Sequence, residues 1–408
     1  MYITWLEMKK ALGSPVLLIL LGLMLAWNVF TMISESKYKQ ELRIVADIVA
    51  TYGQSFDDAV LHVMDADLQQ QAKQLGATDA ATFYEDMTYE AYEQATQDVQ
   101  QQMNHFRLLY TYWQAATQLE SDYTAIHIAT IKQDFIQNEQ MPRWLETHMV
   151  VQFDAWQSRY DAIVATNEYK QWFFLGEYRM HSQLFRQLLK TLAMEGVLIV
   201  ALLTALLMNY QFEQRTQLVV YATKKGRKLW LHQALASLLT SVLLVTSLFT
   251  VTLVMYFTVY DYSALWQTSI SSGMNWEYQL PYITWWDVSV FQYFIFALTI
   301  IALILCIVFL LTCAVALYLK NSYYTWIIVI VSFVAMFVVP MFFSNSVLLW
   351  LSSFNLSLLL MNPHHYLSGG TTFMMTKYNE AWSIGIWFLF ATGALVCAVR
   401  YFNRKDVL

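Results

Sequence analysis

The chain has 408 residues, a net charge of -6 and a hydrophobic content of 57%. Its mean hydropathy of +0.38 is too high for a soluble multidomain protein, in which about half of the residues or fewer are apolar. The three cysteines, Cys306, Cys313 and Cys397, all fall in apolar runs, with neither the spacing of a zinc site nor a place in a water-exposed disulfide framework. The composition therefore excludes soluble and disulfide-stapled classes and indicates a membrane protein.

Residues 1–14 predict a short interfacial helix on the cytosolic side, because its apolar and charged side chains fall largely on different helical faces. The apolar run 15–33 follows, and Pro15 suits the first turn of its helix. This run is longer than the about 7 to 15 apolar residues of a secretory signal, and no small-x-small cleavage site follows it. We expect a retained first span.

Six apolar runs are long enough to cross a hydrocarbon core of about 30 Å. They are 15–33, 193–210, 231–258, 289–317, 324–343 and 382–399. A seventh run, about 346–361, reads "SVLLWLSSFNLSLLLM" and is short and rich in serine, which is more typical of a re-entrant or surface helix. Residues 193–408 are thus predicted to form a five-span membrane domain.

Residues 34–192 are predicted to form a helical extracellular domain, since strand-like alternation is scarce and proline is limited to Pro142. Thr78 or Asp79 suits a helix N-cap, and "NEQMP" indicates a break near Pro142. A long helix over about 83–135 is predicted from an apolar stripe with alternating steps of four and three, which we interpret as core. The stripe is Val99, Met103, Phe106, Tyr110 and Trp113.

The loop 259–288 contains "NWEYQLPYITWWD", which is rich in aromatic residues. Rings of this kind gather at the headgroup level of a bilayer, where one face is buried and a polar edge stays wet. Two interpretations remain open, an interfacial belt and a substrate-contacting lip. The lip residues would be Trp276, Tyr278, Trp285 and Trp286.

Charge predicts the orientation, because Lys and Arg next to spans stay in the cytoplasm. If the N-terminus is cytosolic, segments 1–14, 210–230, 318–323 and 400–408 carry eleven basic and three acidic residues. The segment 34–192 carries twelve basic and twenty-two acidic residues. We therefore expect six spans with both termini in the cytosol, in a bacterial plasma membrane.

Enzyme motifs are missing from the sequence. It has no G-x-x-x-x-G-K-[ST] phosphate loop, no H-E-x-x-H and no G-x-S-x-G. His364 and His365 are adjacent and point apart on a helix or a strand, so no metal site is predicted. The spans are nearly free of charge, Glu195 being the exception, and show no internal repeat, which argues against an ion-coupled transporter. The chain is not expected to be an enzyme.

The order of segments resembles the permease subunits of type-2 ATP-binding-cassette exporters. "LEMKKALGS" precedes the first span, a basic loop with Glu213 and "ATKKGRKLWLHQALA" joins the second and third spans, and "LLLMNPHHYL" precedes the last. The resemblance covers about 250 residues. The large insertion at 34–192 departs from the basic plan of the family and matches members with a large external domain.

The resemblance implies a half-transporter that pairs with a second permease subunit, identical or not, and with a cytosolic ATPase. ATP and Mg²⁺ would bind the ATPase, and this chain would hold no cofactor and no nucleic acid. The loop 211–229 would act as a coupling helix. Its expected ATPase contacts are Glu213, Lys224, Gly226, Arg227 and Lys228. The cargo would be amphipathic or hydrophobic: a peptide, a lipid or an antimicrobial compound. The alternative function is a membrane sensor whose extracellular domain binds a ligand or partner.

Overall fold

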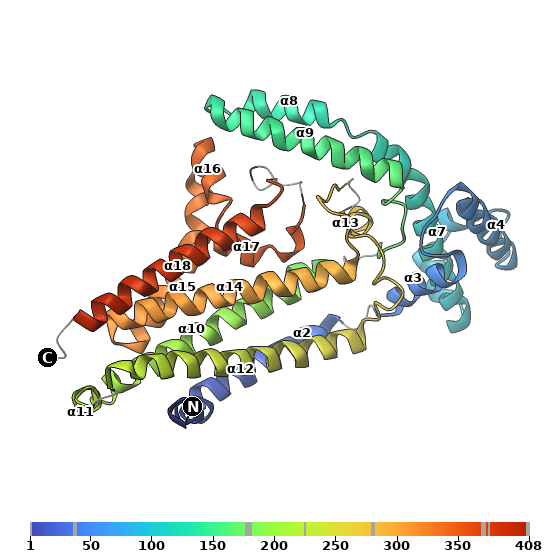
Figure 1. Ribbon diagram of the computed structural model, residues 1–408. Helices are drawn as coiled ribbons and strands as arrows, with labels where there is room; N and C mark the ends of the chain where they lie inside the picture. Colours follow the sequence, from blue (N-terminus) through green and yellow to red (C-terminus); the bar gives the residue numbers. More distant parts are fainter. Residues whose placement is uncertain are drawn as a thin grey trace.

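The computed structural model describes residues 2–35, 39–175, 182–223, 226–278, 282–368, 373 and 376–404. The fold is all-α, as predicted (Figure 1). Within these ranges the only β pairing is three isolated bridges, Ser55 with Gln171, Ser269 with Ser289, and Thr284 with Ser368.

Six helical segments of the described chain are long and apolar enough to cross a membrane, which confirms the predicted number. They are Pro15–Ser34, Gln183–Glu213, Leu229–Val259, Val290–Leu319, Ser322–Phe342 and Asn379–Arg404. The corresponding α-helices are α2 (Pro15–Glu35), α10 (Lys190–Glu213), α12 (Leu229–Val259), α14 (Val290–Leu319), α15 (Ser322–Val338) and α18 (Asn379–Arg404). The chain is therefore a polytopic helical membrane protein.

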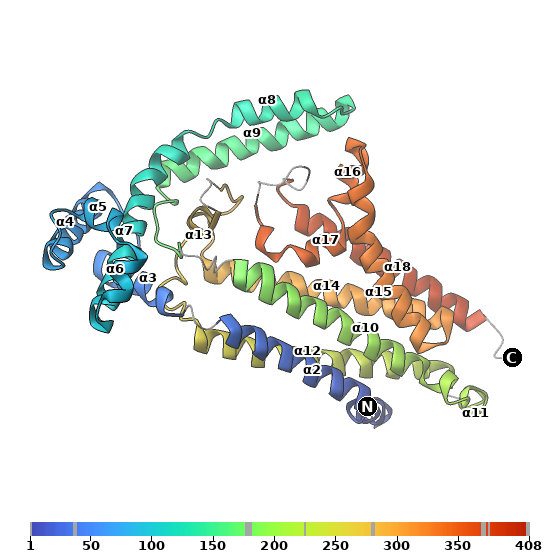
Figure 2. The same ribbon diagram turned by 180° about the vertical axis from the view of Figure 1, so that it is seen from behind.

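Helix α10 is the centre of the bundle, packed against α12, α14 and α15. In its most apolar stretch 72% of the residues are buried, against 50% or less in the other five segments. Gly196 lets α14 come close, because a Cβ at this position would lie 2.9 Å from Leu305 Cδ1. From behind, α2, α12 and α10 run side by side (Figure 2).

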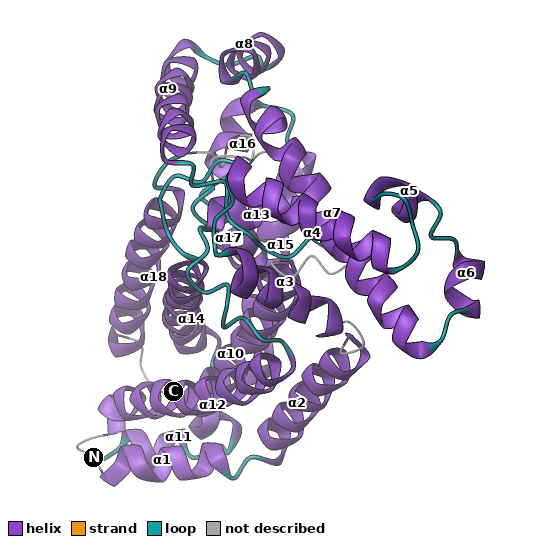
Figure 3. Ribbon diagram, turned by 90° about the vertical axis from the view of Figure 1, so that its right-hand side faces the viewer, coloured by secondary structure: helices purple, strands orange, loops and turns teal. Residues whose placement is uncertain are grey.

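The two ends of the bundle differ. One end carries α1 (Tyr2–Leu12), residues 213–223 and 226–229, residues 319–322 and the end of α18, and we call it the terminal face (Figures 1 and 3). The other end carries residues 259–278, 282–290, 343–368, 373 and 376–379, and we call it the domain face. Here the run 346–361 forms two short helices instead of one. They are α16 (Ser346–Ser352) and α17 (Leu356–Met361), capped by Asn345 and Asn355.

The domain between α2 and α10 is built from seven helices over its described residues. They are α3 (Lys39–Tyr52), α4 (Asp58–Gln74), α5 (Ala80–Glu85), α6 (Tyr89–Gln94), α7 (Gln97–Thr124), α8 (Ile128–Asn138) and α9 (Arg143–Thr166). Helices α8 and α9 form a hairpin that reaches over the domain face toward α16 (Figure 1). There the Ser346 hydroxyl donates to Gln140 O at 2.7 Å, and the Trp144 and Trp350 rings lie 5.5 Å apart.

The prediction of one helix over 83–135 was wrong, because polar side chains and turns divide this stretch into four helices. Thr88 starts α6 by accepting a hydrogen bond from Ala91 N, and α7 ends at Thr124. The predicted cap at Asp79 is confirmed, as is the break before α9 at Pro142.

The stripe on α7 is core for the most part. Phe106 is fully buried and Met103 nearly so, whereas Val99 at the start of the helix is 37% exposed. The buried face of α7 continues the apolar core of the bundle through Trp172 and Phe173, so the nearer helices of this domain and the spans share one hydrophobic cluster.

Candidate functional site

Helix α1 is held against the start of α12 on the terminal face. Thr4 Oγ1 lies 3.1 Å from His232 Nδ1, and Ala11 is buried against the spans. Glu7 is 3% exposed and pairs with Lys10 Nζ at 2.7 Å. The Lys10 ammonium in turn lies 4.6 Å from the centroid of the Tyr210 ring, on α10. The N-terminal helix is thus tied to both helices that flank the loop 213–229.

Glu213, the last residue of α10, reaches the start of α15. Its Oε1 accepts hydrogen bonds from the backbone N–H of Ser322, at 3.0 Å, and from the Ser322 hydroxyl. A carboxylate is favourable here, because the first N–H groups of a helix are unpaired and carry its positive dipole end. Glu213 therefore links the second span to the fifth, a contact the sequence does not reveal.

The loop itself contains α11 (Gln217–Tyr221) and the 3-10 turn η3 (Gly226–Lys228). Gly226 is buried and its N–H donates to Thr223 O at 2.9 Å, while Lys228 is exposed at the N-cap of α12. Lys224 and the side chain of Arg227 lie outside the described residues.

Sequence reasoning missed two residues of this loop. Leu218 and Val219 on α11 are 60% and 75% exposed. The signal was the apolar pair itself inside a charged loop, because exposed apolar side chains that lie together are a feature of interaction surfaces. Together with Lys228 these side chains make the terminal face both basic and partly apolar.

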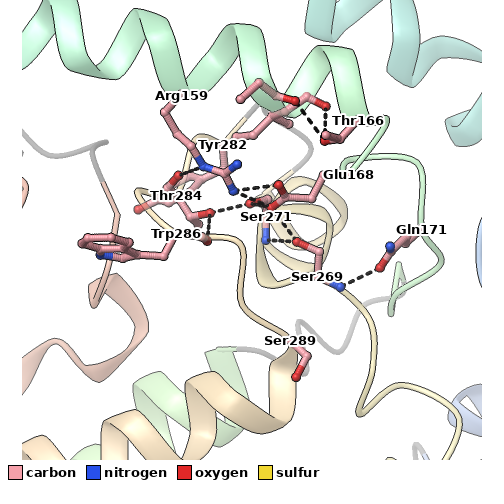
Figure 4. Close-up of polar contacts among 12 residues, drawn as sticks. Arg159, Thr166, Glu168, Gln171, Ser269, Ser271, Tyr282, Thr284, Trp286 and Ser289 are labelled. Atoms are coloured by element: carbon pink, nitrogen blue, oxygen red, sulfur yellow. Dashed lines mark hydrogen bonds and ion pairs between the residues drawn. The ribbon is translucent and has the colours of Figure 1, made fainter.

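A second polar site joins the domain between α2 and α10 to the domain face (Figure 4). Asn167 ends α9 in the left-handed conformation, with φ 54°, and this turn directs the following Glu168 back toward Arg159. Arg159 Nη2 donates to both carboxylate oxygens of Glu168 at 2.7 Å, and Arg159 Nε donates to Thr284 O at 2.9 Å. The Glu168 residue is 6% exposed, so this is a buried ion pair.

Serines from the loop before α14 complete this site (Figure 4). The Ser269 and Ser271 hydroxyls donate to Glu168 Oε1 at 2.8 and 2.7 Å. Gln171 Oε1 accepts from Ser269 N at 2.6 Å. We call Arg159, Glu168, Gln171, Ser269 and Ser271 the junction. It ties the end of α9 to the loop between the third and fourth spans.

The tryptophans predicted as an aromatic belt or lip lie around the junction. Trp276, on α13 (Ile270–Tyr278), and Trp285 are only 3% and 4% exposed, and Trp276 Nε1 donates to Gln171 O at 2.5 Å. Trp286 is half-buried, with the Lys377 ammonium 4.9 Å from its ring centroid. The side chain of Tyr278 lies outside the described residues. In this conformation the rings of Trp276 and Trp285 are buried beside the junction and do not face outward.

His365 lies near the junction and binds the same loop. Tyr282 Oη lies 2.8 Å from its Nδ1 and also donates to Ser368 Oγ at 2.9 Å. Burial, together with the positive charge of Arg186, lowers the pKa of His365 to about 4. The imidazole is therefore neutral at physiological pH. No group of three or more metal-ligating side chains occurs within the described part of the chain.

The domain between α2 and α10 has a groove of about 320 Å³ between α4 and α7. Its lining combines the carboxylates of Asp58, Asp65 and Glu120 with the ring of Trp113. Lys170 Nζ crosses one end of it to Glu120 Oε2 at 2.9 Å. The groove is acidic and lies in the same polypeptide stretch that leads into the junction.

Comparison of the chain with protein-family models, with curated proteins and with solved structures gives no match.

Proposed function

We propose that this chain is the membrane subunit of an ATP-driven exporter, which moves an amphipathic or hydrophobic cargo and is powered by a separate cytosolic ATPase. The six apolar segments and the order of the loop motifs support this proposal. The terminal face would be cytosolic, in line with its excess of basic residues.

The observation that carries the proposal is the linkage of the loop 213–229 to several spans at once. The loop joins α10 to α12 directly, and Glu213 binds the first residue of α15. Helix α1 bridges the same two helices through Thr4 and Lys10. An ATPase that pushed on α11 and η3 would therefore move three spans. A subunit whose spans are driven by ATP hydrolysis requires such a coupling.

The test is ATP hydrolysis by the chain purified together with its ATPase in liposomes. We expect the wild-type chain to stimulate turnover and Arg227→Glu to abolish the stimulation while the complex still forms. Arg404→Glu is the matched control, since Arg404 carries the same charge on the same face but lies at the end of α18. Equal rates with and without the chain, or equal rates for Arg227→Glu and wild type, would refute the proposal.

One observation favours the alternative, a membrane sensor. The domain between α2 and α10, which would be extracellular, has an acidic groove, and the junction fastens this domain to the loop between two spans. In a sensor, replacement of residues 39–175 by a short linker would abolish the response to an external ligand, and no cargo would move in either protein. ATP-dependent cargo movement by the intact complex would rule the sensor out as the main function.

A further inference from the structure

A polar cavity of about 190 Å³ lies between three spans near the domain face. Asn28 and Thr31 of α2 line one side, and Tyr256 of α12 contributes to the wall. Gln183 and Thr191 line the other side, from the π-helical segment η2 (Ser182–Leu189) and from α10. Such a concentration of polar side chains between apolar helices is unusual, because each polar group is expensive to hold away from water.

The cavity lies part of the way along the first span. Asn28 is seven residues from the end of α2 at Glu35, which at about 1.5 Å per residue places it about 10 Å along the helix from that end. Trp27, next to it, lines the cavity and is 58% exposed on the lipid-facing side of the bundle. The cavity is therefore next to the bilayer interior, with an aromatic ring at its edge.

The amide of Asn28 has a fixed orientation. Its Nδ2 donates to Glu195 Oε2 at 2.9 Å and lies 3.4 Å from Thr252 Oγ1. In this orientation both neighbours accept from the amide nitrogen, and Oδ1 lies on the other side of the amide. The residue is 1% exposed, and Oδ1 accepts no hydrogen bond from any described residue. An unpaired buried acceptor costs about 1 to 3 kcal/mol.

Gln183 repeats this arrangement. Its Nε2 donates to Tyr260 Oη at 3.0 Å, and its Oε1 finds no donor among the described residues. Two residues of the cavity lining thus carry a buried carbonyl oxygen with no donor among the described residues, and one of them, Asn28, is also bonded to the Glu195 carboxyl group. The described lining of the cavity contains no Lys or Arg that could donate to these oxygens. The ring of Trp27 adds a face that attracts cations.

We infer that this cavity binds the head group of an amphiphilic amine, whose ammonium donates hydrogen bonds to Asn28 Oδ1 and Gln183 Oε1. The hydrocarbon chain lies outside the cavity, along Trp27 in the bilayer. Both unpaired acceptors gain a charge-assisted partner, which is stronger than a neutral one. The inference that such an amine is the cargo rests on the proposed function. The inference that the chain binds this amine does not.

The test uses the full chain in phosphatidylcholine nanodiscs, labelled with a diazirine derivative of dodecylamine and mapped by mass spectrometry. We expect labelling of residues 24–32 and 183–191, displaced by dodecylamine. Trimethyldodecylammonium, which has the charge but no N–H donor, should compete about tenfold less well, the loss expected for a charge-assisted hydrogen bond. Dodecanoate should not compete. Equal competition by the trimethyl compound, or labelling elsewhere, would overturn the inference.

Two variants keep the result interpretable. Asn28→Leu should weaken displacement by dodecylamine about tenfold, and so should Gln183→Leu. Asn209→Leu is the matched control, because Asn209 is also a buried span residue with Nδ2 bonded, to Thr325 Oγ1 at 3.2 Å, and with Oδ1 unpaired among the described residues. It lies near the terminal face, so the variant should leave displacement unchanged. An equal loss in Asn209→Leu would show a general packing defect and refute the site.

The amine could come from a membrane lipid or from a single-chain amphiphile, and the nanodisc composition separates them. Phosphatidylethanolamine keeps the N–H donors that phosphatidylcholine lacks. If its addition blocks labelling, the occupant is a lipid of the bilayer. If labelling persists, the occupant is a free amphiphile. In proteoliposomes that contain the ATPase, labelling and ATP turnover are measured together. Loss of labelling with unchanged ATP turnover would refute this site but not the proposed function.

Discussion

Removal of the charge of Glu168 should destabilise the junction. Glu168→Gln keeps the size of the side chain and one acceptor oxygen but leaves the guanidinium of Arg159 without its anion. That side chain is only 14% exposed, so water replaces the lost partner poorly. Removing one partner of a buried ion pair costs about 3 to 5 kcal/mol. We expect the lower end, about 3 kcal/mol, because glutamine still accepts a hydrogen bond.

Hydrogen exchange measures this loss locally. The Ser269 amide is protected by Gln171 Oε1, and the Ile270 amide by Val288 O at 3.0 Å. Because about 1.4 kcal/mol corresponds to a factor of ten, a loss of 3 kcal/mol should speed exchange of these amides about 100-fold. The amides of α15, which lie outside the junction, should exchange at an unchanged rate.

A double-mutant cycle separates the ion pair from general damage. Arg159→Met alone leaves the Glu168 carboxylate uncompensated, and the double variant with Glu168→Gln leaves no buried charge. We expect the double variant to lose at least about 1 kcal/mol less than the sum of the two single losses. Strict additivity, or unchanged exchange of Ser269 in Glu168→Gln, would refute our account of the junction.

Three further predictions concern packing, acid sensitivity and capping. Gly196→Val should cost about 1 to 3 kcal/mol through its clash with Leu305, seen as a lower Tm in detergent, and Leu305→Ala should restore part of it. The pKa of His365 is lowered from 6.5 to about 4 in the fold, so its contribution to stability is complete above pH 6.5 and lost as pH falls toward 4. His365→Gln should therefore flatten the decline of Tm with acid over that range, and an unchanged slope would contradict the assignment. Asn355→Ala should cost about 1 kcal/mol at the start of α17, with exchange of the Ser357 amide about fivefold faster.

The sequence was sufficient to predict the six spans, because an apolar run of this length has few alternatives to a membrane helix. It did not show that the apolar segment containing 193–210 begins at Gln183. The stretch "SQLFRQLL" contains Gln183, Arg186 and Gln187, which break the hydrophobic pattern. These polar side chains are tolerated because Leu184, Phe185 and Leu189 are buried against neighbouring helices.

The candidate sites could be predicted only in part. The loop 213–229 is visible in the sequence because its charge differs from that of its surroundings. The partner of Glu213 is 109 residues away, and no local pattern connects it to Ser322. The junction is equally hidden, since Glu168 binds serines more than 100 residues further along the chain. Contacts of this kind depend on tertiary packing.

The π-helical segment η2 has a consequence for the neighbouring span. A π-helix closes its hydrogen bonds over five residues and holds one residue more per turn than continuous α-helix would require. If η2 rewound into α-helix, the side chains before Lys190 would turn about the axis progressively, reaching about 100°, the angle of one residue step, at the start of η2. Gln183 would then leave the wall that faces α2, and its amide oxygen would no longer point at the same space as Asn28. A one-residue slip in the winding of this helix would thus dismantle the polar cavity without moving any span out of the bundle.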